Sequence, residues 1–197
     1  AVLAELAGAD GITIHLREDR RHIQDRDVDL LMKTARTGIN LELAATSEVL
    51  AIACELRPMQ ATLVPEKREE ITTEGGLDLT TPDSREAHTV ALKGLTSAGV
   101  RTALFIDPDE EAIRASVDMG ADAVELHTGE YANARGQERT AQLGRLNSAA
   151  SLACKLSLAV HAGHGLTYEN VTPVAAIPEI EELNIGHSIM ARAMFTG

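Results

Sequence analysis

Two histidines and two glycines close an apolar run near the C-terminus. Residues 156–165 read LSLAVHAGHG, so the run ends in His161, Gly163, His164 and Gly165. Imidazole exchanges protons near neutral pH, and glycine allows backbone N–H groups to approach an anion closely. The stretch therefore predicts acid–base chemistry beside an anion-binding loop, at the end of a buried strand.

Two carboxylates stand inside similar apolar runs. Glu42 lies in NLELA and Glu125 lies in AVELH. Burying an unpaired carboxylate costs several kcal/mol, so the tolerable place for each is a polar cavity beside histidines or arginines. Desolvation there raises a carboxyl pKa toward neutrality and makes the group a usable base. A structural ion pair is the alternative interpretation of both residues.

Most of the histidines share one kind of position. Five of the seven are predicted at or just beyond the ends of apolar strands: His15, His127, His161, His164 and His187. A single histidine at a strand end is usually a structural hydrogen-bonding partner. Five such residues on one face of a sheet favour a catalytic site instead.

Cationic side chains follow the first of these strands. The segment HLREDRRH contains Arg17, Arg20, Arg21 and His22. Arginine matches phosphate with paired donors, but the neighbouring acidic residues will pair with some of these groups. We predict a phosphate-binding role for Arg17 and His22 alone.

A second glycine–histidine pair lies near the C-terminus. Gly186 and His187 in NIGHS lead directly into a predicted helix, as Gly163 and Gly165 precede the segment LTYEN, where we also predict a helix to begin. Phosphate groups commonly bind at glycine-rich loops after the last two strands of a (β/α)8 barrel. The two segments together predict a second anion site.

These residues require a scaffold of alternating strands and helices. Asp25 is predicted to start a helix that stops at Gly38, and Asp107 to cap a helix that ends at Gly120. The strands between the helices are near-continuous apolar runs, which is typical of parallel sheets that are covered on both faces. The predicted strands are 11–16, 39–44, 61–64, 101–106, 123–127, 156–161 and 183–186.

One internal repeat supports this organisation. GADGITIHL at 8–16 and GADAVELHT at 120–128 share a helix-ending Gly-Ala-Asp, a strand and a histidine at the same offset. Seven βα units predict an α/β fold of the (β/α)8 TIM-barrel class, forming a single domain over 1–197. Residues 1–7 look like the end of a helix, so we expect the first strand to be missing through truncation or disorder. A flavodoxin-like open sheet is the alternative architecture.

One predicted connection is unusually long. Residues 65–84 show no apolar period, whereas most βα loops have about 2–6 residues. Gly75 and Gly76 with the threonines before them fit a lid that closes over a site. A floppy surface insertion is the alternative interpretation.

Composition narrows the classes of function. A net charge of −12 argues against nucleic acid or an anionic membrane as the main partner, although an arginine cluster still permits an anionic small molecule. No apolar stretch approaches the ~20 residues of a membrane span, and the N-terminus lacks the pattern of a secretion signal. Cys54 and Cys154 lie on apolar stripes and are predicted to be buried structural thiols, which fits a reducing cytoplasm.

Several long motifs resemble one enzyme family. GADGITIHLREDRRHIQDRDV, NLELA, LVPEKREE, ITTEGGLD, ELHTGEYA, AGHGLTY and IPEIEELNIGHSIMARA occur in the order found in pyridoxine 5′-phosphate synthase, an enzyme of bacterial vitamin B6 synthesis. The resemblance runs from about residue 8 to the end of the chain. One departure is the first strand, which in the family carries an Asn-x-Asp-His run and is followed by an arginine.

The resemblance implies a reaction and its partners. The family condenses 1-deoxy-D-xylulose 5-phosphate with 3-amino-2-oxopropyl phosphate and releases phosphate and water. It uses no metal and no organic cofactor. The resemblance further implies a cytoplasmic homo-octamer.

The resemblance also assigns roles to individual residues. His15 and Glu42 match proton acceptors, His164 matches the proton donor, and Glu125 matches a carboxylate that stabilises the transition state. Positions that match contacts to the deoxyxylulose phosphate are Arg17, His22 and Thr72. Positions that match contacts to the amino-ketone phosphate are Gly165, Gly186 and His187.

Two other functions remain open from the residues alone. A metal-dependent barrel hydrolase or aldolase would use His161, His164, Glu125 and His127 as ligands. A phosphate-binding barrel without turnover would follow if the first strand is truly absent.

Overall fold

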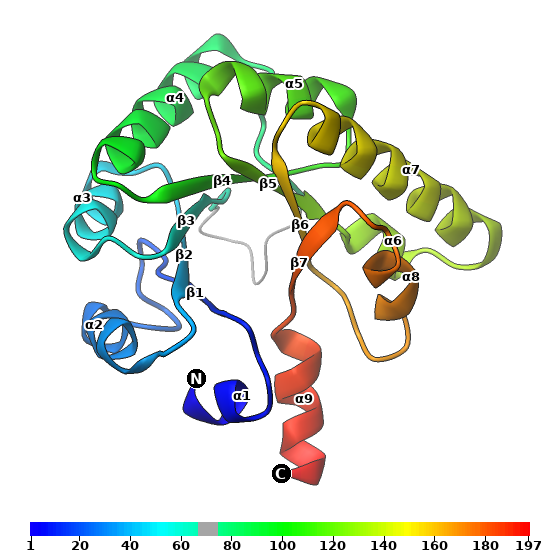
Figure 1. The fold of residues 1–197 in the computed structure, drawn as a ribbon, viewed down its shortest axis with the longest axis horizontal. Helices are drawn as coiled ribbons and strands as arrows, with labels where there is room; N and C mark the ends of the chain where they lie inside the picture. The colour runs from blue at the N-terminus through cyan, green and yellow to red at the C-terminus, as the bar shows by residue number, and fades with distance from the viewer. Residues whose placement is uncertain (67–74) are drawn as a thin grey trace.

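Seven parallel strands form one curled sheet in the part of the chain that the structure describes. The computed structural model describes residues 1–66 and 75–197. Each strand pairs with the next one along the chain, so the spatial order is sequential from β1 to β7 (Figure 1). The strands are β1 (Ile12–His15), β2 (Ile39–Leu43), β3 (Gln60–Leu63), β4 (Arg101–Ile106), β5 (Ala123–His127), β6 (Ala159–Gly163) and β7 (Ile180–Asn184).

Most of the helices cover the outer, convex face of this sheet, whereas the first and the last helix of the chain lie at its open side (Figure 1). The described helices are α1 (Val2–Leu6), α2 (Asp25–Thr34), α3 (Ser47–Leu56), α4 (Pro82–Ser97), α5 (Glu110–Met119), α6 (Gly129–Asn133), α7 (Gly136–Lys155), α8 (Val171–Ala175) and α9 (His187–Thr196). The helix α5 shows why the pattern folds this way. It begins with an acidic first turn after its N-cap Asp109 and ends at Gly120, whose φ of 82° favours glycine.

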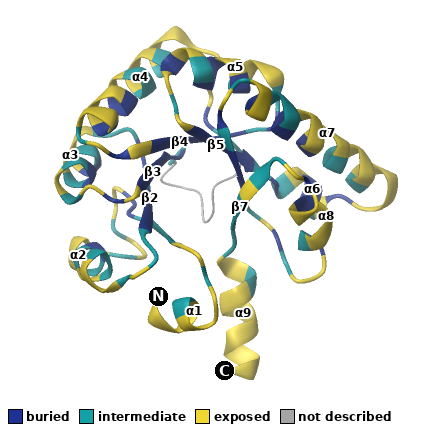
Figure 2. Ribbon diagram, in the orientation of Figure 1, coloured by how far each residue is buried: buried dark blue, intermediate teal, exposed yellow. Residues whose placement is uncertain are grey.

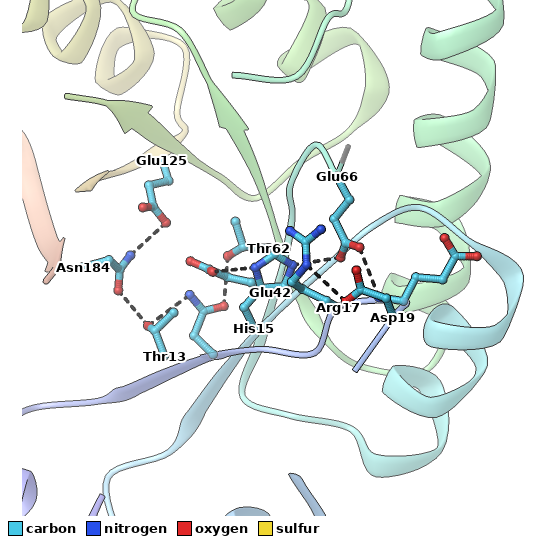
Figure 3. A network of polar contacts seen from close by, with 11 residues as sticks. Thr13, His15, Arg17, Asp19, Glu42, Thr62, Glu66, Glu125 and Asn184 are labelled. Carbon is cyan, nitrogen blue, oxygen red and sulfur yellow. Dashed lines mark hydrogen bonds and ion pairs between the residues drawn. The ribbon is translucent and has the colours of Figure 1, made fainter. Parts of the chain in front are cut away.

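Side chains alternate between the two faces of the sheet. The strand β2 is largely buried (Figure 2). Its Leu41 and Leu43 are fully buried in the apolar core, while Glu42 between them points into the interior (Figure 3). The interior is polar along most of its length. Its inward-facing polar side chains include Thr13, His15, Asn40, Glu42, Gln60, Thr62, Glu125, His161 and Asn184.

The two edge strands face each other across an open side of the curled sheet (Figure 1). No ladder joins β1 to β7 within the described residues, although the Thr13 hydroxyl donates to Asn184 Oδ1 at 2.7 Å. The seven strands found in the described residues confirm the predicted (β/α) barrel class, and they are consistent with the predicted lack of one strand of the usual eight. The sequential order contains no switch point, so the flavodoxin-like alternative is wrong.

Two predicted strands are displaced from their observed positions. The strand predicted at 156–161 is observed at Ala159–Gly163, and the one predicted at 183–186 is observed at Ile180–Asn184. Leu156 and Ser157 complete the turn after α7, where the Ser157 φ of 66° lies outside the β region. The end of a helix and the start of a strand can both be apolar, so the hydrophobic pattern alone did not show where α7 ends and β6 begins.

Some predicted helix starts are also wrong. The helix α2 begins at Asp25, as predicted, with Gln24 as its N-cap, whereas Asp109 rather than Asp107 caps α5. The helix predicted at LTYEN begins only at Val171, because the Asn170 side chain accepts from the Thr167 N–H and closes a turn there. Within the predicted long loop, α4 already begins at Pro82.

The cysteines are less buried than predicted. Cys54 is partly buried against the core, whereas Cys154 is exposed on α7. The prediction of a buried thiol is wrong for Cys154, because the α7 stripe that enters the core contains Leu146, Ala150 and Ala153. Across the described ranges, we find no helix with the length and apolar character that crossing a bilayer demands.

The core gives a direct test of the fold. Leu104 in β4 is fully buried in the apolar cluster between the sheet and its helices. We expect Leu104→Ala to lower the free energy of unfolding by about 2–5 kcal/mol, since the deletion removes buried methyl groups and leaves a cavity. Urea unfolding followed by circular dichroism measures the change. A loss below about 1 kcal/mol would contradict the placement of Leu104 in the core.

Candidate active site

The first cluster of the site joins β1, β2 and the segment after β3 (Figure 3). His15 Nε2 lies 2.8 Å from Glu66 Oε1, and His15 Nδ1 lies 3.8 Å from Glu42 Oε2. Burial raises the pKa of Glu42, and the nearby His15 offsets only part of this effect. Burial also opposes ionisation of Glu66, but hydrogen bonds from His15 and from the Glu18 N–H outweigh it, so the pKa of Glu66 is lowered.

These shifts separate the two carboxyl groups chemically. Glu66 stays ionised and orients the His15 ring, whereas Glu42 becomes more basic than an ordinary carboxylate. A carboxylate with a raised pKa next to an oriented imidazole is suited to accept and return protons. The arrangement agrees with the prediction that Glu42 lies in a polar interior beside a histidine.

The second cluster surrounds Glu125 (Figure 3). Asn184 Nδ2 donates to Glu125 Oε2 at 2.9 Å, and the Thr13 hydroxyl donates to the other end of the same amide. Burial raises the pKa of Glu125 well above its ordinary value, and the charge of Glu42 raises it further. Glu125 is therefore suited to hold a proton and to donate a hydrogen bond at neutral pH.

A glycine makes room for this carboxyl group. A Cβ at Gly163 would lie 2.1 Å from Glu125 Oε1, far inside any permitted contact. Gly163 thus permits the close approach of β6 to Glu125. This contact concerns the Glu125 carboxyl group, so the binding of an anion by the Gly163 backbone stays a prediction.

His164 closes the loop after β6 in a strained conformation. Its φ of 79° is unusual for a residue with a side chain and is typical of functional loops. Its ring packs on Phe105 with 4.8 Å between centroids and lies 5.6 Å from the His127 ring. Burial, and then the neighbouring His127 and His15, lower the pKa of His164 to about 4.

The low pKa of His164 predicts a pH effect on stability. The unfolded residue binds its proton near pH 6.5, so this contribution to folding is complete above pH 6.5 and is lost as the pH falls toward about 4. Between these values we expect the wild type to lose about 2–3 kcal/mol more unfolding free energy than His164→Gln. Guanidinium unfolding of both proteins at a series of pH values measures the difference. Parallel pH curves would contradict the lowered pKa.

The predicted phosphate ligands near β1 differ in their placement. Arg17 is 5% exposed and lines a small cavity of about 220 Å³ together with Glu18, Asp19, Glu48 and Glu66. Arg17 Nε also lies 3.4 Å from Asp19 Oδ1. Arg20 pairs with Asp25 and Glu48, and Arg21 pairs with Asp19, as predicted for the surface cations. His22 is exposed, and Thr72 lies outside the described residues.

The second predicted anion site has two parts. Gly165, with a φ of 72°, lines a cavity of about 790 Å³ together with His164 and His127. Gly186 caps α9, and His187 is its first residue, as predicted. Both Gly186 and His187 are exposed.

His161 differs from its predicted position. It lies inside β6 rather than at its end, almost fully buried, with Nδ1 3.4 Å from Gln60 Nε2 and 3.8 Å from Glu182 Oε1. Burial lowers the pKa of His161. Over residues 1–66 and 75–197, no group of three histidine, cysteine or acidic side chains is placed to hold a metal ion, so the ligand set of the metal-dependent alternative is not assembled there.

The sequence did not predict a role in the site for three residues that the structure places there. Glu66 orients His15, Asn184 binds Glu125, and Asp107 lies 3.1 Å from His127 Nδ1. Each of the three follows or ends a strand, and a polar residue at such a position is the feature of the sequence that could have indicated a site role. Glu66 and Asp107 were instead assigned to a loop and to a helix cap, and Asn184 was placed in a strand without a role.

The fold and the site together define an α/β barrel enzyme whose interior carries buried acid–base groups. Its chain matches the family model described as pyridoxal phosphate biosynthesis protein PdxJ over residues 1–197. Pyridoxine 5′-phosphate synthase of Trichlorobacter lovleyi is 55% identical over 100% of this chain and 82% of the relative, and that of a Synechococcus strain is 59% identical with the same coverage. The chain belongs to the PdxJ family and is a biosynthetic enzyme, as predicted.

Solved structures with low sequence identity support the fold. Phosphoribosyl anthranilate isomerase from Thermus thermophilus aligns over 93% of this chain and 80% of its own, with a TM-score of 0.59 and 18% identity. The BexX/CysO complex from Amycolatopsis orientalis aligns over 98% of this chain and 79% of its own, with a TM-score of 0.58 and 18% identity. These likenesses concern the barrel scaffold alone.

Proposed function

We propose that this chain is a pyridoxine 5′-phosphate synthase that condenses 1-deoxy-D-xylulose 5-phosphate with 3-amino-2-oxopropyl phosphate. The reaction closes the pyridine ring and releases inorganic phosphate and water. The observation that carries the proposal is the convergence of His15, Glu42 and Glu125 on one polar interior, in a chain whose relatives are named pyridoxine 5′-phosphate synthase.

In this proposal, Glu42 and His15 accept protons from the condensing substrates. The raised pKa of Glu42 supports this role, because a base works best when its pKa is near the working pH. The ionised Glu66 supports it as well, since it holds the His15 ring through Nε2 and leaves Nδ1 toward Glu42. Each positioned acid or base contributes about 10²–10⁴-fold to the rate.

His164 and Glu125 act as donors in the same scheme. The free His164 imidazole is neutral at neutral pH because its pKa is near 4. A phosphate dianion bound at the adjacent Gly165 favours the imidazolium form, so substrate binding would charge His164 for donation. Glu125 keeps its proton through burial and donates a hydrogen bond to the oxygen on which negative charge develops.

The two phosphorylated substrates require two anion sites. The proposal assigns the deoxyxylulose phosphate to Arg17, His22 and Thr72, and the amino-ketone phosphate to Gly165, Gly186 and His187. Arg17 is buried next to the interior cluster, which supports the first assignment. Gly165 lines the larger cavity together with His164, which supports the second.

The remaining parts of the proposal follow from the family. We infer a cytoplasmic homo-octamer that acts without a metal or organic cofactor, has no nucleic-acid or membrane partner, and binds inorganic phosphate as a product. Size-exclusion chromatography with light scattering tests the octamer.

A mixing assay tests the function directly. The purified chain is incubated with both phosphorylated substrates, and the pyridoxine chromophore and free phosphate are followed together. We expect one inorganic phosphate for each pyridoxine 5′-phosphate, because two phosphates enter and the product keeps one. Phosphate binding without product would instead identify a binding barrel without turnover.

A further inference from the structure

A carboxylate–imidazole pair lies at the carboxyl ends of β4 and β5, apart from the Glu42 and Glu125 clusters. Asp107 Oδ1 lies 3.1 Å from His127 Nδ1, and the same oxygen accepts a hydrogen bond from the Gly76 N–H at 3.0 Å. The hydrogen bond with His127 lowers the pKa of Asp107, so its carboxylate is ionised at neutral pH. An ionised carboxylate only accepts hydrogen bonds, so His127 Nδ1 carries the proton.

This assignment leaves Nε2 as the basic nitrogen of His127. Within the described residues, no hydrogen bond is formed by Nε2. A Cβ at residue 129 would lie 2.4 Å from Nε2, so Gly129 permits the His127 ring to lie close against the backbone of the next segment. His127, Asp107 and Gly129 all line the cavity of about 790 Å³.

The same cavity contains the ring of His164. Phe105 packs against both imidazoles, with 5.4 Å between its centroid and that of His127 and 4.8 Å to that of His164. Packing against Phe105 therefore fixes the positions of the His127 and His164 rings relative to each other. Both rings lie next to the loop that contains Gly165. A molecule that contacts His164 in this cavity is also within reach of His127.

We propose that His127 is a further catalytic base of this enzyme and that Asp107 is the positioning residue that fixes its tautomer. The inference rests on the proposed function. His127 Nε2 takes one proton from the bound amino-ketone or an intermediate derived from it, and the resulting imidazolium faces the Asp107 carboxylate. Release of that proton to water in the cavity returns the imidazole to its neutral form, so the proton balance is closed.

The Asp107→Asn variant tests the positioning role. The amide has the size of the carboxylate but lacks its charge, so we expect kcat to fall about 10–100-fold while KM changes less than about threefold. Asp118→Asn makes the same chemical change at an exposed position of α5 and is expected to keep kcat within about twofold. A kcat of Asp107→Asn within twofold of the wild type would overturn the proposal.

Chemical rescue tests the catalytic role. We expect His127→Ala to lose about 10²–10⁴-fold in kcat and to regain at least tenfold when imidazole is added, because the cavity has room for the missing ring. A merely structural role of His127 would not respond to added imidazole, and the absence of rescue would overturn the proposal.

A third readout does not depend on activity. Nitrogen NMR of the histidine-labelled protein should find a protonated Nδ1 and an unprotonated Nε2 for His127 at neutral pH. The opposite tautomer would overturn the proposal. Wild-type protein that makes no pyridoxine 5′-phosphate while showing the expected tautomer would refute the proposed function and leave the Asp107–His127 pair intact.

Discussion

Glu42→Gln is expected to lower kcat for the condensation by about 10²–10⁴-fold and to leave the affinity for a phosphorylated ligand within a few-fold. The amide keeps the shape of the side chain but cannot accept a proton at neutral pH. Because Glu42 is inside the polar interior and its pKa is raised, the loss should appear in the chemical step rather than in binding. Steady-state kinetics and calorimetric titration with the substrate measure the two effects.

A matched substitution controls this experiment. Glu55→Gln changes an exposed carboxylate of α3, the helix that follows β2, and should leave kcat within about twofold. Turnover of Glu42→Gln near that of the wild type would remove Glu42 from the mechanism. Equal loss of ligand affinity and of kcat would show a binding role in place of base catalysis.

Gly163→Ala is expected to abolish most activity although it adds a single methyl group. The new Cβ would lie 2.1 Å from Glu125 Oε1 and 3.2 Å from the Asn184 carbonyl oxygen, so the carboxyl group or strand β6 must move. We expect kcat to fall at least about 10²-fold, since a displacement of about 1 Å at a catalytic group has an effect of this size. The free energy of unfolding should fall by about 1–3 kcal/mol through overpacking.

The control for this change is another glycine. A Cβ at Gly94 in α4 meets nothing within 4 Å, so Gly94→Ala should leave activity unchanged and raise stability by about 0.5–1 kcal/mol. Steady-state kinetics measure kcat of both variants, and urea unfolding measures their free energies of unfolding. If Gly163→Ala were as active and stable as Gly94→Ala, Glu125 would not lie where the site requires it.

Periodicity was sufficient to predict the βα order and the inward direction of Glu42 and Glu125. A carboxylate between two leucines can be buried only where the interior is polar, and the observed interior is polar. The acidic residues next to Arg20 and Arg21 in the sequence likewise predicted that these arginines form ion pairs at the surface. These predictions rest on burial and charge, which each residue and its neighbours determine locally.

Contacts between strands could not be predicted in the same way. The pairing of His15 with Glu66 depends on how far the chain turns after β3, and the link between Glu125 and Asn184 depends on the register of β5, β6 and β7. A register shift lies between Val160 and His161, and the predicted strand end at His161 was wrong. Such irregularities leave no signature in the alternation of apolar and polar letters.

A crystal structure of this chain with bound pyridoxine 5′-phosphate tests the central claim most directly. We expect the pyridine ring inside the curled sheet, in contact with Glu42 and Glu125, and the phosphate group at the loop of His164 and Gly165. A product molecule bound outside the sheet, or one with neither carboxyl group within hydrogen-bonding distance, would contradict the site described above.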